Sequence, residues 1–456
     1  MTKFGNLIKK YWQWFSILAV VLIAVGAFTY TRTQVKASSG NGKVKVAFWH
    51  EMKGPGAKQI DAYVKEFNKS QSKYEVVAEF EGGYNGVIQK IMNTHGTAAS
   101  PAVFQSMDIS TSQMYHSGFT TPMQKFVDRD HYDLDQIIPG ARAVYSRNNQ
   151  LLSMPFNSSQ TALYYNKAVL KKYGITPPPV DPTYKDITRV AKEIHDKSKG
   201  KVKGMTMEAY SWLFEQALAN AGQSFSNHGN GHEGDATKVS FTSPSAINVM
   251  KWVKENIDYG DFINFGSGGN SSANEAASFL SGHLGIFMQS SAKTGQLYKV
   301  LKNDLGVTYY PHEDGKKANG IAVGGASLWI SNDKSAEVQN GAWEFTKFMV
   351  NSKNQAIWQA KTGYLAVNKA SQDEPVLKAL FKKSPVLKVS GDQMRRTVPN
   401  DTNSGIFIDG LVPARTSIQN AMQQIFAGQD IYKSLKAAEN SYNKVLESNN
   451  RANGRG

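Results

Sequence analysis

The sequence predicts an α/β fold made of two lobes with a cleft between them. The first observation behind this prediction is a β-α-β-α-β rhythm between residues 43 and 105, and the second is another alternating series that begins after residue 160. The third is composition, because 456 residues with 41% hydrophobic content can bury large cores and are unlike a disordered chain. Ligands of such folds bind where strands end, so we expect a cleft at the carboxyl ends of the strands.

The first series begins with a strand over residues 43–48. Val44, Val46 and Phe48 alternate with other residues there and therefore share one face. Apolar residues then recur at helical spacing, and strand-like segments separate the helices. The further elements predicted in this series are, in order, a helix over 56–69, a strand over 74–80, a helix around 87–92 and a strand over 101–105.

The second series continues the same alternation to the end of the chain. Apolar stripes of helical spacing lie around 184–194 and 247–257, and the last hundred residues are mostly helical. Four short apolar segments are predicted strands: 163–166, 284–288, 306–310 and 326–330. The predicted helices of the C-terminal part are 338–348, 357–362, 416–427 and 431–448.

Two glycine-rich stretches interrupt the second series. Residues 227–235 (NHGNGHEGD) contain His228 and His232, whose spacing would suit two metal ligands on a helix. Because this stretch is rich in helix breakers, we interpret it as a solvated loop and predict no metal site. Residues 266–272 (GSGGNSS) lack the GxGxxG spacing of a nucleotide-binding turn, and we predict a flexible loop there as well.

The N-terminal 40 residues differ from the rest of the chain. Lys3, Lys9 and Lys10 precede an apolar stretch over 14–30, and small residues follow it. This order is typical of a secretory signal, yet the apolar stretch is also about as long as the shortest membrane-spanning helix. We therefore expect residues 1–40 to be either a cleaved signal peptide or a retained anchor. Both place the remainder outside the cell, because the lysines stay on the cytoplasmic side.

Charge and cysteine content limit the classes of partner. The net charge of +15 is spread along the chain, and no run of five like charges occurs. We therefore predict a basic soluble surface and no nucleic-acid partner. The chain has no cysteine, which excludes disulfides, thiolate metal sites, a cysteine nucleophile and a lipid-bearing N-terminal cysteine.

Motifs of common enzymes are absent from the sequence. It contains no GxxxxGK[ST] loop, no HExxH pair and no GxSxG elbow. Glu79, Glu81 and Asp108 are candidate carboxylates for glycosidase chemistry, but the spacing singles out no pair among them. We therefore predict no catalytic residue, no metal and no cofactor.

Aromatic and small polar residues instead gather in turn-like contexts, several of them directly after predicted strands. Aromatic faces suit the carbons of a polyol, carboxylates and hydroxyls suit its OH groups, and arginine with glycine N–H groups suits an anion. This combination predicts a binding protein for a small polar solute. The residues that carry this prediction are Trp49, His50, Tyr84, Asp108, Asn157, Ser158, Ser159, Tyr210, Trp212, Ser290, Ser291, Gly324, Gly325, Tyr364 and Arg415.

At these residues the chain resembles the extracellular solute-binding proteins of ATP-driven importers, and among them the glycerol-3-phosphate binders. The resemblance runs from about residue 43 to about residue 448. The segments that carry it are VAFWHEM (46–52), EGGYNGVIQKI (81–91), MPFNSSQTALYYNK (154–167), GGASLWI (324–330) and KTGYLAVNKA (361–370).

The resemblance implies a fold and its division into domains. It implies two α/β lobes joined by three crossings, which we place near 157–160, 320–325 and 364–367. The expected N-lobe comprises 43–157 and 325–364, and the expected C-lobe comprises 160–323 and 366–448. Residues 449–456 form a polar tail.

The resemblance also implies a function and roles for single residues. Eight of the residues named above carry over as ligand contacts through the resemblance: Tyr84, Asp108, Ser159, Trp212, Ser290, Gly325, Tyr364 and Arg415. Trp212 matches a tryptophan that stacks on glycerol, and Asp108 stands where the family usually has a glutamate. A second family tryptophan has no clean match, and Tyr210 lies nearby. The implied protein is a monomer and not an enzyme, and it delivers glycerol-3-phosphate or a glycerophosphodiester to membrane permease subunits.

Three other functions compete with this one. A binder of a neutral sugar or oligosaccharide would use the same scaffold, with a structural role for Arg415. An extracellular hydrolase of phosphodiesters or glycans would release products. A basic adhesin or nucleic-acid binder would show steep salt dependence.

Overall fold

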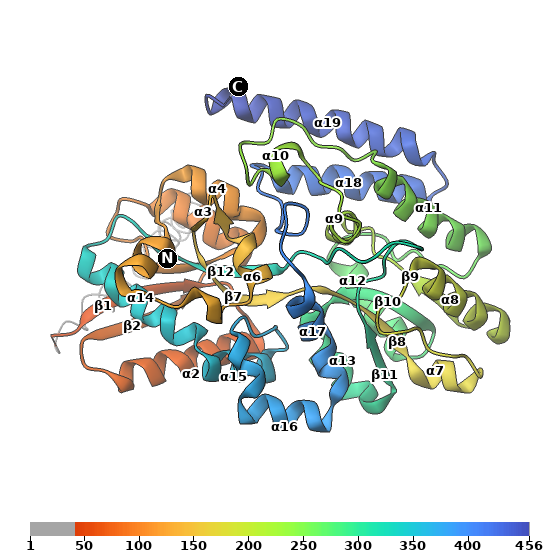
Figure 1. Cartoon of the computed structure of the whole chain (residues 1–456), viewed down its shortest axis with the longest axis horizontal. Coiled ribbons are helices and arrows are strands. Elements are labelled where there is room, and N and C mark those ends of the chain that lie inside the picture. Colours follow the sequence, from red (N-terminus) through yellow and green to blue (C-terminus); the bar gives the residue numbers. More distant parts are fainter. Residues whose placement is uncertain (1–41, 456) are drawn as a thin grey trace, which may run out of the picture.

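The computed structural model describes residues 42–455, with Tyr84, Asn85 and Gly269 described by their backbone alone. The predicted signal or anchor over 1–40 lies outside the described residues. Two α/β lobes lie side by side, each built around its own sheet (Figure 1). The predicted two-lobed α/β class is therefore confirmed.

The sheet of the first lobe has the strand order β2-β1-β3-β12-β4, with β7 paired to β12. Strands β1, β2 and β3 are parallel, whereas β12 runs antiparallel to β3, β4 and β7. The bounds are β1 Val44–His50, β2 Tyr74–Phe80, β3 Val103–Met107, β4 Thr120–Thr121, β7 Met154–Ser159 and β12 Gly324–Ser331. A strand from late in the chain thus completes a sheet begun at its start.

Aromatic packing holds helices against this sheet. Phe67 of α2 (Gly54–Ser70) lies 5.2 Å from the ring of Phe345 in α14 (Ala336–Val350), centroid to centroid. Trp358 of α15 (Ser352–Thr362) packs 4.5 Å from the ring of Phe156. All four side chains are almost fully buried, and such pairs add to the burial of apolar surface.

The sheet of the second lobe has the order β11-β8-β10-β9. Strand β8 is antiparallel to β10 and β11, and β9 is parallel to β10. The bounds are β8 Thr161–Asn166, β9 Lys203–Thr206, β10 Leu284–Ser290 and β11 Leu305–Thr308.

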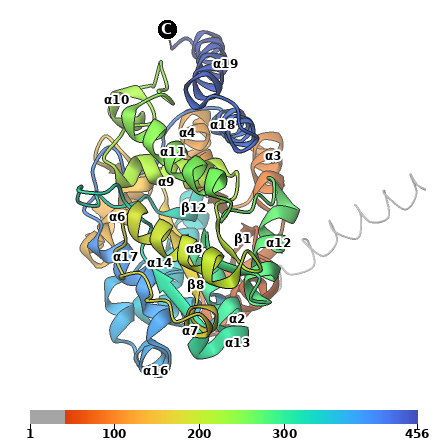
Figure 2. The same ribbon diagram turned by 90° about the vertical axis from the view of Figure 1, so that its right-hand side faces the viewer.

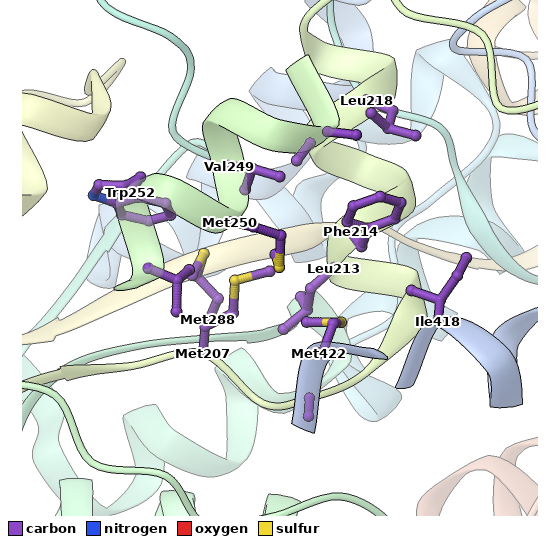
Figure 3. Close-up of a cluster of buried hydrophobic side chains, with 14 of the residues drawn as sticks. Met207, Leu213, Phe214, Leu218, Val249, Met250, Trp252, Met288, Ile418 and Met422 are labelled. Carbon is purple, nitrogen blue, oxygen red and sulfur yellow. The ribbon is translucent and has the colours of Figure 1, made fainter. Parts of the chain in front are cut away.

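Methionines and aromatic residues fill the core between this sheet and its helices (Figure 3). Phe214 of α9 (Ser211–Asn220) and Met250 of α11 (Pro244–Tyr259) are both fully buried there. Met422 joins them from α18 (Leu411–Phe426), so a C-terminal helix belongs to the core of the second lobe. The long helix α19 (Ile431–Ala452) lies along α18 at the same end of the molecule (Figures 1 and 2).

The remaining helices surround the two sheets. They include α3 Tyr84–Thr94, α4 Thr111–Ser117, α5 Met123–Asp130, α6 Pro139–Val144, α7 Lys167–Lys172, α8 Tyr184–Ser198, α10 Asn227–Asn230, α12 Gly269–Leu280, α13 Thr294–Leu301, α16 Pro375–Lys383 and α17 Val389–Arg396. A small hairpin, β5 Ser146–Arg147 with β6 Gln150–Leu151, projects from the first lobe.

Three segments far apart in the sequence run side by side between the lobes. Ser158 pairs with Gly325 in the β7–β12 ladder and also with Leu365 in an isolated bridge. The buried side chain of Gln160 donates to the carbonyl of Ile321, 2.9 Å away. These contacts join the segments for which three crossings were predicted. Helix α16, which follows the third segment, packs on α15 of the first lobe. The exact bounds of the two lobes therefore remain a prediction.

The predicted strands and long helices occur close to where the pattern placed them, but both glycine-rich stretches differ. In 227–235, Asn227–Asn230 forms the short helical turn α10, and His232 is largely buried with its Nδ1 3.1 Å from the carbonyl oxygen of Ser146. In 266–272, helix α12 begins at Gly269. His228 and Gly229 have left-handed φ angles of 56°, so Asn227–Asn230 is an irregular turn and agrees with the predicted loop. The predictions were wrong at the buried His232 and from Gly269 onward, because tertiary packing orders segments that lack a local pattern of their own.

Candidate functional site

A cavity of about 200 Å³ opens between the lobes at the ends of their strands. Seven of the eight residues expected to contact the ligand line it, and they come from both lobes. The lining residues are Met107, Asp108, Ser159, Tyr210, Trp212, Gln289, Ser290, Gly324, Gly325, Tyr364 and Arg415. Tyr84, the eighth, is the first residue of α3, and its side chain is not described.

Asp108 and Gly325 bring two chain segments together on the first-lobe side. Asp108 directly follows β3, and the backbone N–H of Gly325 in β12 donates to its carboxylate. Gly325 has a φ of +113°, and a Cβ atom added there would lie 2.1 Å from the carbonyl oxygen of Asn157. The close approach of β7 therefore requires glycine at this position. The Gly325 amide, expected to face an anion, is thus already engaged by Asp108.

Arg415 of α18 is held by Glu215 of α9 in a bidentate ion pair. Nε of Arg415 lies 2.8 Å from Oε1 of Glu215, and Nη2 lies 2.7 Å from Oε2. Ser211 donates a third hydrogen bond to Oε1 at 2.8 Å. The side chains of Arg415 and Glu215 are only 10% and 5% exposed, so water screens the pair little. Nη1 of Arg415 stays available for a ligand within the part of the chain described.

Burial and charge raise the pKa of the carboxyls around Asp108. Desolvation raises the pKa of Asp108 to about 6, while the nearby guanidinium of Arg415 opposes the shift. Behind Asp108, burial followed by the charge of Asp108 raises the pKa of Glu51 to about 9. Among the described residues, neither carboxyl oxygen of Glu51 has a hydrogen-bond partner, and neither has the nearby hydroxyl of Tyr145. At neutral pH Glu51 is therefore a neutral acid.

The second-lobe wall is built from side chains fixed by local hydrogen bonds. Ser290 ends β10, and its Oγ accepts from the backbone N–H of Ala292 at 3.3 Å. Gln289 donates to Ser272 Oγ at 2.9 Å. Trp212 packs closely over Gly324, where an added Cβ atom would lie 2.9 Å from the indole ring. These supports hold an aromatic face and a hydroxyl at the cavity wall.

Sequence reasoning missed Glu215, the residue with the largest influence on Arg415. It lies in SWLFEQALAN, a helix that is buried on all sides, and a lone acid in such a helix was the signal available. Its partner is 200 positions away, so spacing could not reveal the pair. Gln289 was missed as well, because its hydrogen-bond partner Ser272 is likewise not a neighbour in the sequence.

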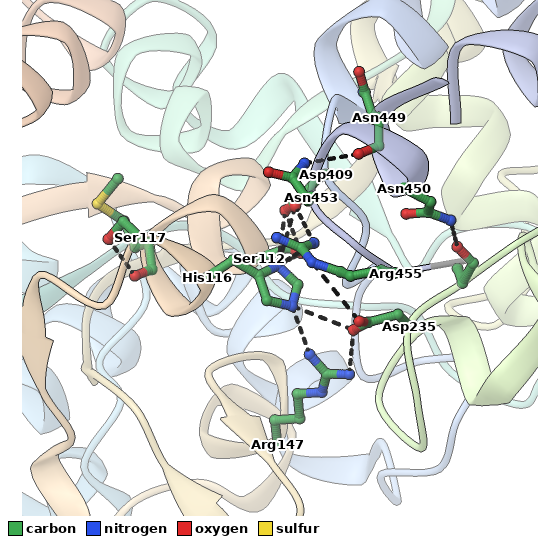
Figure 4. A network of polar contacts seen from close by, with 12 residues as sticks. Ser112, His116, Ser117, Arg147, Asp235, Asp409, Asn449, Asn450, Asn453 and Arg455 are labelled. Atoms are coloured by element: carbon green, nitrogen blue, oxygen red, sulfur yellow. Dashed lines mark hydrogen bonds and ion pairs between the residues drawn. The ribbon is translucent and has the colours of Figure 1, made fainter. Parts of the chain in front are cut away.

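A polar network joins the lobes beside the cavity (Figure 4). Arg147 of the β5–β6 hairpin donates to Asp235, with Nη2 2.6 Å from Oδ1. His116 of α4 lies between Asp235 and Asp409, with nitrogen–oxygen distances of 3.2 and 3.1 Å. Arg455, near the C-terminus, also bonds Asp409. Asp235 belongs to the stretch predicted to be a solvated loop, and the structure instead places it in an interlobe contact.

Within residues 42–455, no three His, Asp or Glu side chains are grouped so as to hold a metal ion. Over the same residues, no helix has the length and apolar character needed to cross a bilayer.

Comparison with known proteins supplies the family. The model of the bacterial extracellular solute-binding proteins matches residues 62–386. The chain belongs to this family. Its members are substrate-binding components of ABC importers and not enzymes, so the predictions of a solute-binding protein without catalytic activity are confirmed.

Individual members of the family are similar to this solute-binding protein over most of their length. It is 27% identical to the sn-glycerol-3-phosphate-binding periplasmic protein UgpB of Yersinia pseudotuberculosis over 84% of this chain and 88% of that protein. Identity to UgpB of Escherichia coli K12 is likewise 27%, with the same coverage.

Solved structures confirm the fold. UgpB of Mycobacterium tuberculosis in complex with glycerophosphocholine matches with a TM-score of 0.73 at 20% identity, over 90% of this chain and 99% of that one. The sugar-binding protein MalE of Xanthomonas citri matches with a TM-score of 0.77 at 15% identity, over 91% and 100%.

Proposed function

We propose that this solute-binding protein captures glycerol-3-phosphate or a glycerophosphodiester outside the cell and delivers it to the permease of an ABC importer. One observation carries the proposal. Seven residues chosen from the sequence for polyol and phosphate chemistry, from Asp108 to Arg415, line one cavity between the lobes. The relatives named for sn-glycerol-3-phosphate support the same class of solute.

The proposed contacts divide between the two ends of the ligand. Arg415, through its Nη1, and the hydroxyls of Ser159 and Ser290 would hold the phosphate, since charge-assisted hydrogen bonds contribute roughly 1.5–3 kcal/mol each. Trp212 would cover the glycerol carbons, and Asp108 would accept from its hydroxyls. Asp108 has to face the polyol end, because its carboxylate repels the phosphate.

Closure of the lobes would turn binding into a signal for the permease. The ligand would touch both lobes and would therefore favour the closed arrangement over the open one. Closure changes the outer surface that membrane subunits contact. We further propose that the protein acts as a monomer, held at the outer membrane face by residues 1–40 or released after their cleavage.

A ligand panel tests the proposal. Thermal unfolding would be followed with glycerol-3-phosphate, glycerophosphocholine, maltose and maltotriose, because a ligand raises the unfolding temperature of the state it binds. We expect a shift with one or both phosphate esters and none with the sugars. Shifts with the sugars alone would contradict the proposal.

A neutral sugar is the second candidate, and a specific observation favours it. Glu215 already pairs with Arg415, so the cavity holds less unpaired positive charge than a bare arginine would give it. A sugar would then occupy the aromatic wall at Trp212, with Arg415 in a structural role. The maltose and maltotriose arms of the panel decide between the two.

A further inference from the structure

We propose that Glu215 is a positioning residue that sets the charge of the ligand, so that the cleft prefers a singly charged phosphodiester to a doubly charged phosphate monoester. The inference rests on the proposed function and deepens it. Its basis is the geometry of the ion pair between Glu215 and Arg415, together with the acids that face the pair.

The pair is built within one lobe. Arg415 lies on α18 and Glu215 on α9, and both helices pack in the core of the second lobe. Three hydrogen bonds, two from Arg415 and one from Ser211, fix the Glu215 carboxylate. Opening and closing of the lobes therefore leaves the pair intact, and the guanidinium meets every ligand in the same orientation.

In this arrangement Glu215 affects Arg415 in two distinct ways, through the orientation of the guanidinium and through the net charge of the pair. The bidentate bond occupies Nε and Nη2 and directs Nη1 away from Glu215, so the ligand receives a fixed hydrogen-bond donor. The carboxylate also offsets the positive charge of the guanidinium. A phosphate at this position gains hydrogen bonds but meets a group whose net charge is close to zero.

Among the described residues, acids are the nearest charged neighbours of the pair. Asp108 faces it from the first lobe, with Glu51 and Tyr145 behind it, and Tyr210 lies over Arg415 with the guanidinium 6.0 Å from its ring. The charges next to the ligand are thus one guanidinium against the carboxylates of Glu215 and Asp108. Farther out on the second-lobe side, Glu208 lies near Tyr210 and Lys293 lies near Glu208. A second negative charge on the ligand would be repelled by the two nearest carboxylates.

Two phosphate esters that differ in charge test the inference. The second ionisation of a phosphate monoester has a pKa of about 6, so glycerol-3-phosphate is mainly a dianion at pH 7.5 and mainly a monoanion at pH 5.5. Glycerophosphocholine carries a singly charged phosphate and a permanent choline cation at both values, so its charge does not change with pH and the change of the affinity ratio reports the charge of the monoester. Titration calorimetry on the whole protein would give the ratio of the two affinities at each pH.

We expect the natural protein to favour the diester by about tenfold or more at pH 7.5, because one added charge near a carboxylate is worth that much in a partly screened site. The ratio should decrease at pH 5.5, where the monoester is mainly a monoanion. Asp108 also gains a proton over this range, and because its carboxylate repels a dianion more than a monoanion, this change lowers the ratio in the same direction. The substitutions of Glu215 therefore isolate the part of the preference that is due to Glu215.

Two substitutions separate charge from position. Glu215→Gln removes the negative charge, and the ratio at pH 7.5 should fall by about tenfold. Glu215→Asp keeps the charge but shortens the reach to Arg415, so both affinities should fall while the ratio stays near that of the natural protein. Glu439→Gln alters a buried carboxylate of the second lobe that binds Phe241 and Thr242, and it controls for general destabilisation.

Each outcome has one meaning. A ratio that is unchanged in Glu215→Gln, with both esters still bound, overturns the inference and leaves the proposed function intact. Binding of neither ester by the natural protein overturns the proposed function itself. If Glu215→Gln fails to fold, an affinity ratio for the natural protein that does not change between pH 7.5 and 5.5 overturns the inference alone.

Discussion

Arg147 and Asp235 form an ion pair across the two lobes, with Nη2 of the arginine 2.6 Å from Oδ1 of the aspartate. Arg147 is 7% exposed, and its guanidinium lies 4.9 and 4.8 Å from the ring centroids of Tyr115 and Phe407. The aromatic rings hold the cation whether or not the acid is present. The ion pair therefore links Asp235 of the second lobe to Arg147, which is held in place on the first lobe.

Asp235→Asn should lower the free energy of unfolding by about 1–2 kcal/mol, between the values for exposed and for fully buried pairs. Urea unfolding would measure this change in the free energy of unfolding. As a control, Asp258→Asn breaks the exposed helical pair of Lys254 and Asp258, and it should change stability by no more than about 0.5 kcal/mol. Equal stabilities of the two variants would argue against an interlobe role for Asp235.

Replacing Arg415 alone should harm both folding and binding. Arg415→Met leaves the buried charge of Glu215 without its cation and with only the hydrogen bond from Ser211, and we expect a loss of about 3–5 kcal/mol in unfolding free energy. Affinity for the phosphate ester should fall by about 2–5 kcal/mol, and Arg415→Ala should weaken binding by a similar amount.

The double substitution Arg415→Met with Glu215→Met separates the two effects. Removing both charges should bring stability back to within about 1 kcal/mol of the natural protein, because two apolar side chains replace the pair without a buried charge. Binding should stay lost. Urea unfolding and calorimetry with glycerophosphocholine measure the two quantities, and undiminished affinity in either variant would remove Arg415 from the site.

Stability should decrease as pH rises. The pKa of Glu51 is about 9 in the folded protein and near 4.5 in an unfolded chain, so the folded state retains a proton that the unfolded state releases. The contribution of Glu51 to the free energy of unfolding is fully present below about pH 4.5. It decreases by about 1.4 kcal/mol per pH unit as the pH rises and is lost at about pH 9. Asp108 acts in the same direction up to about pH 6.

Glu51→Gln should remove roughly half of this slope above pH 7, because burial also raises the pKa of Glu275 to about 9 and makes it a second proton-retaining carboxyl. Urea unfolding at pH 6.5, 7.5 and 8.5 would compare it with the natural protein. Glu66→Gln, at a carboxylate 48% exposed, is the matched control and should keep the slope. A natural protein whose stability is flat over this range would contradict a buried, proton-retaining Glu51.

Gly325→Ala should disturb the cleft through the backbone alone. An added Cβ atom would lie 2.1 Å from the Asn157 carbonyl oxygen, and φ is +113°, so β12 has to move away from β7. We expect a loss of more than about 1 kcal/mol in unfolding free energy together with weaker ligand binding.

Gly282→Ala provides the comparison for Gly325→Ala. Gly282 also has positive φ, +78°, but the nearest atom to its added Cβ is 3.8 Å away. This variant should lose only the unfolding free energy that alanine costs at a positive φ, and it should bind ligand normally. Normal binding by Gly325→Ala would show that the approach of β7 to β12 does not shape the site.

Much of the secondary structure and several residues of the cleft lining follow from the sequence alone. Period-two and helical patterns reflect which faces are buried, and burial of strands and long helices is a local regularity that a single sequence displays. Residues at the ends of strands, such as Asp108 after β3 and Ser290 at the end of β10, line the same cavity because strands of both sheets end there.

Which charges meet depends on the tertiary structure. Glu215 reaches Arg415 across 200 positions, and Asp235 reaches Arg147 across 88, with no spacing rule that joins them. The physical reason is that a buried charge is tolerated only beside its partner, and the partner is supplied by how helices pack and not by the neighbouring sequence. For that reason several residues that line the cavity could be predicted, whereas the ion pair at its wall could not.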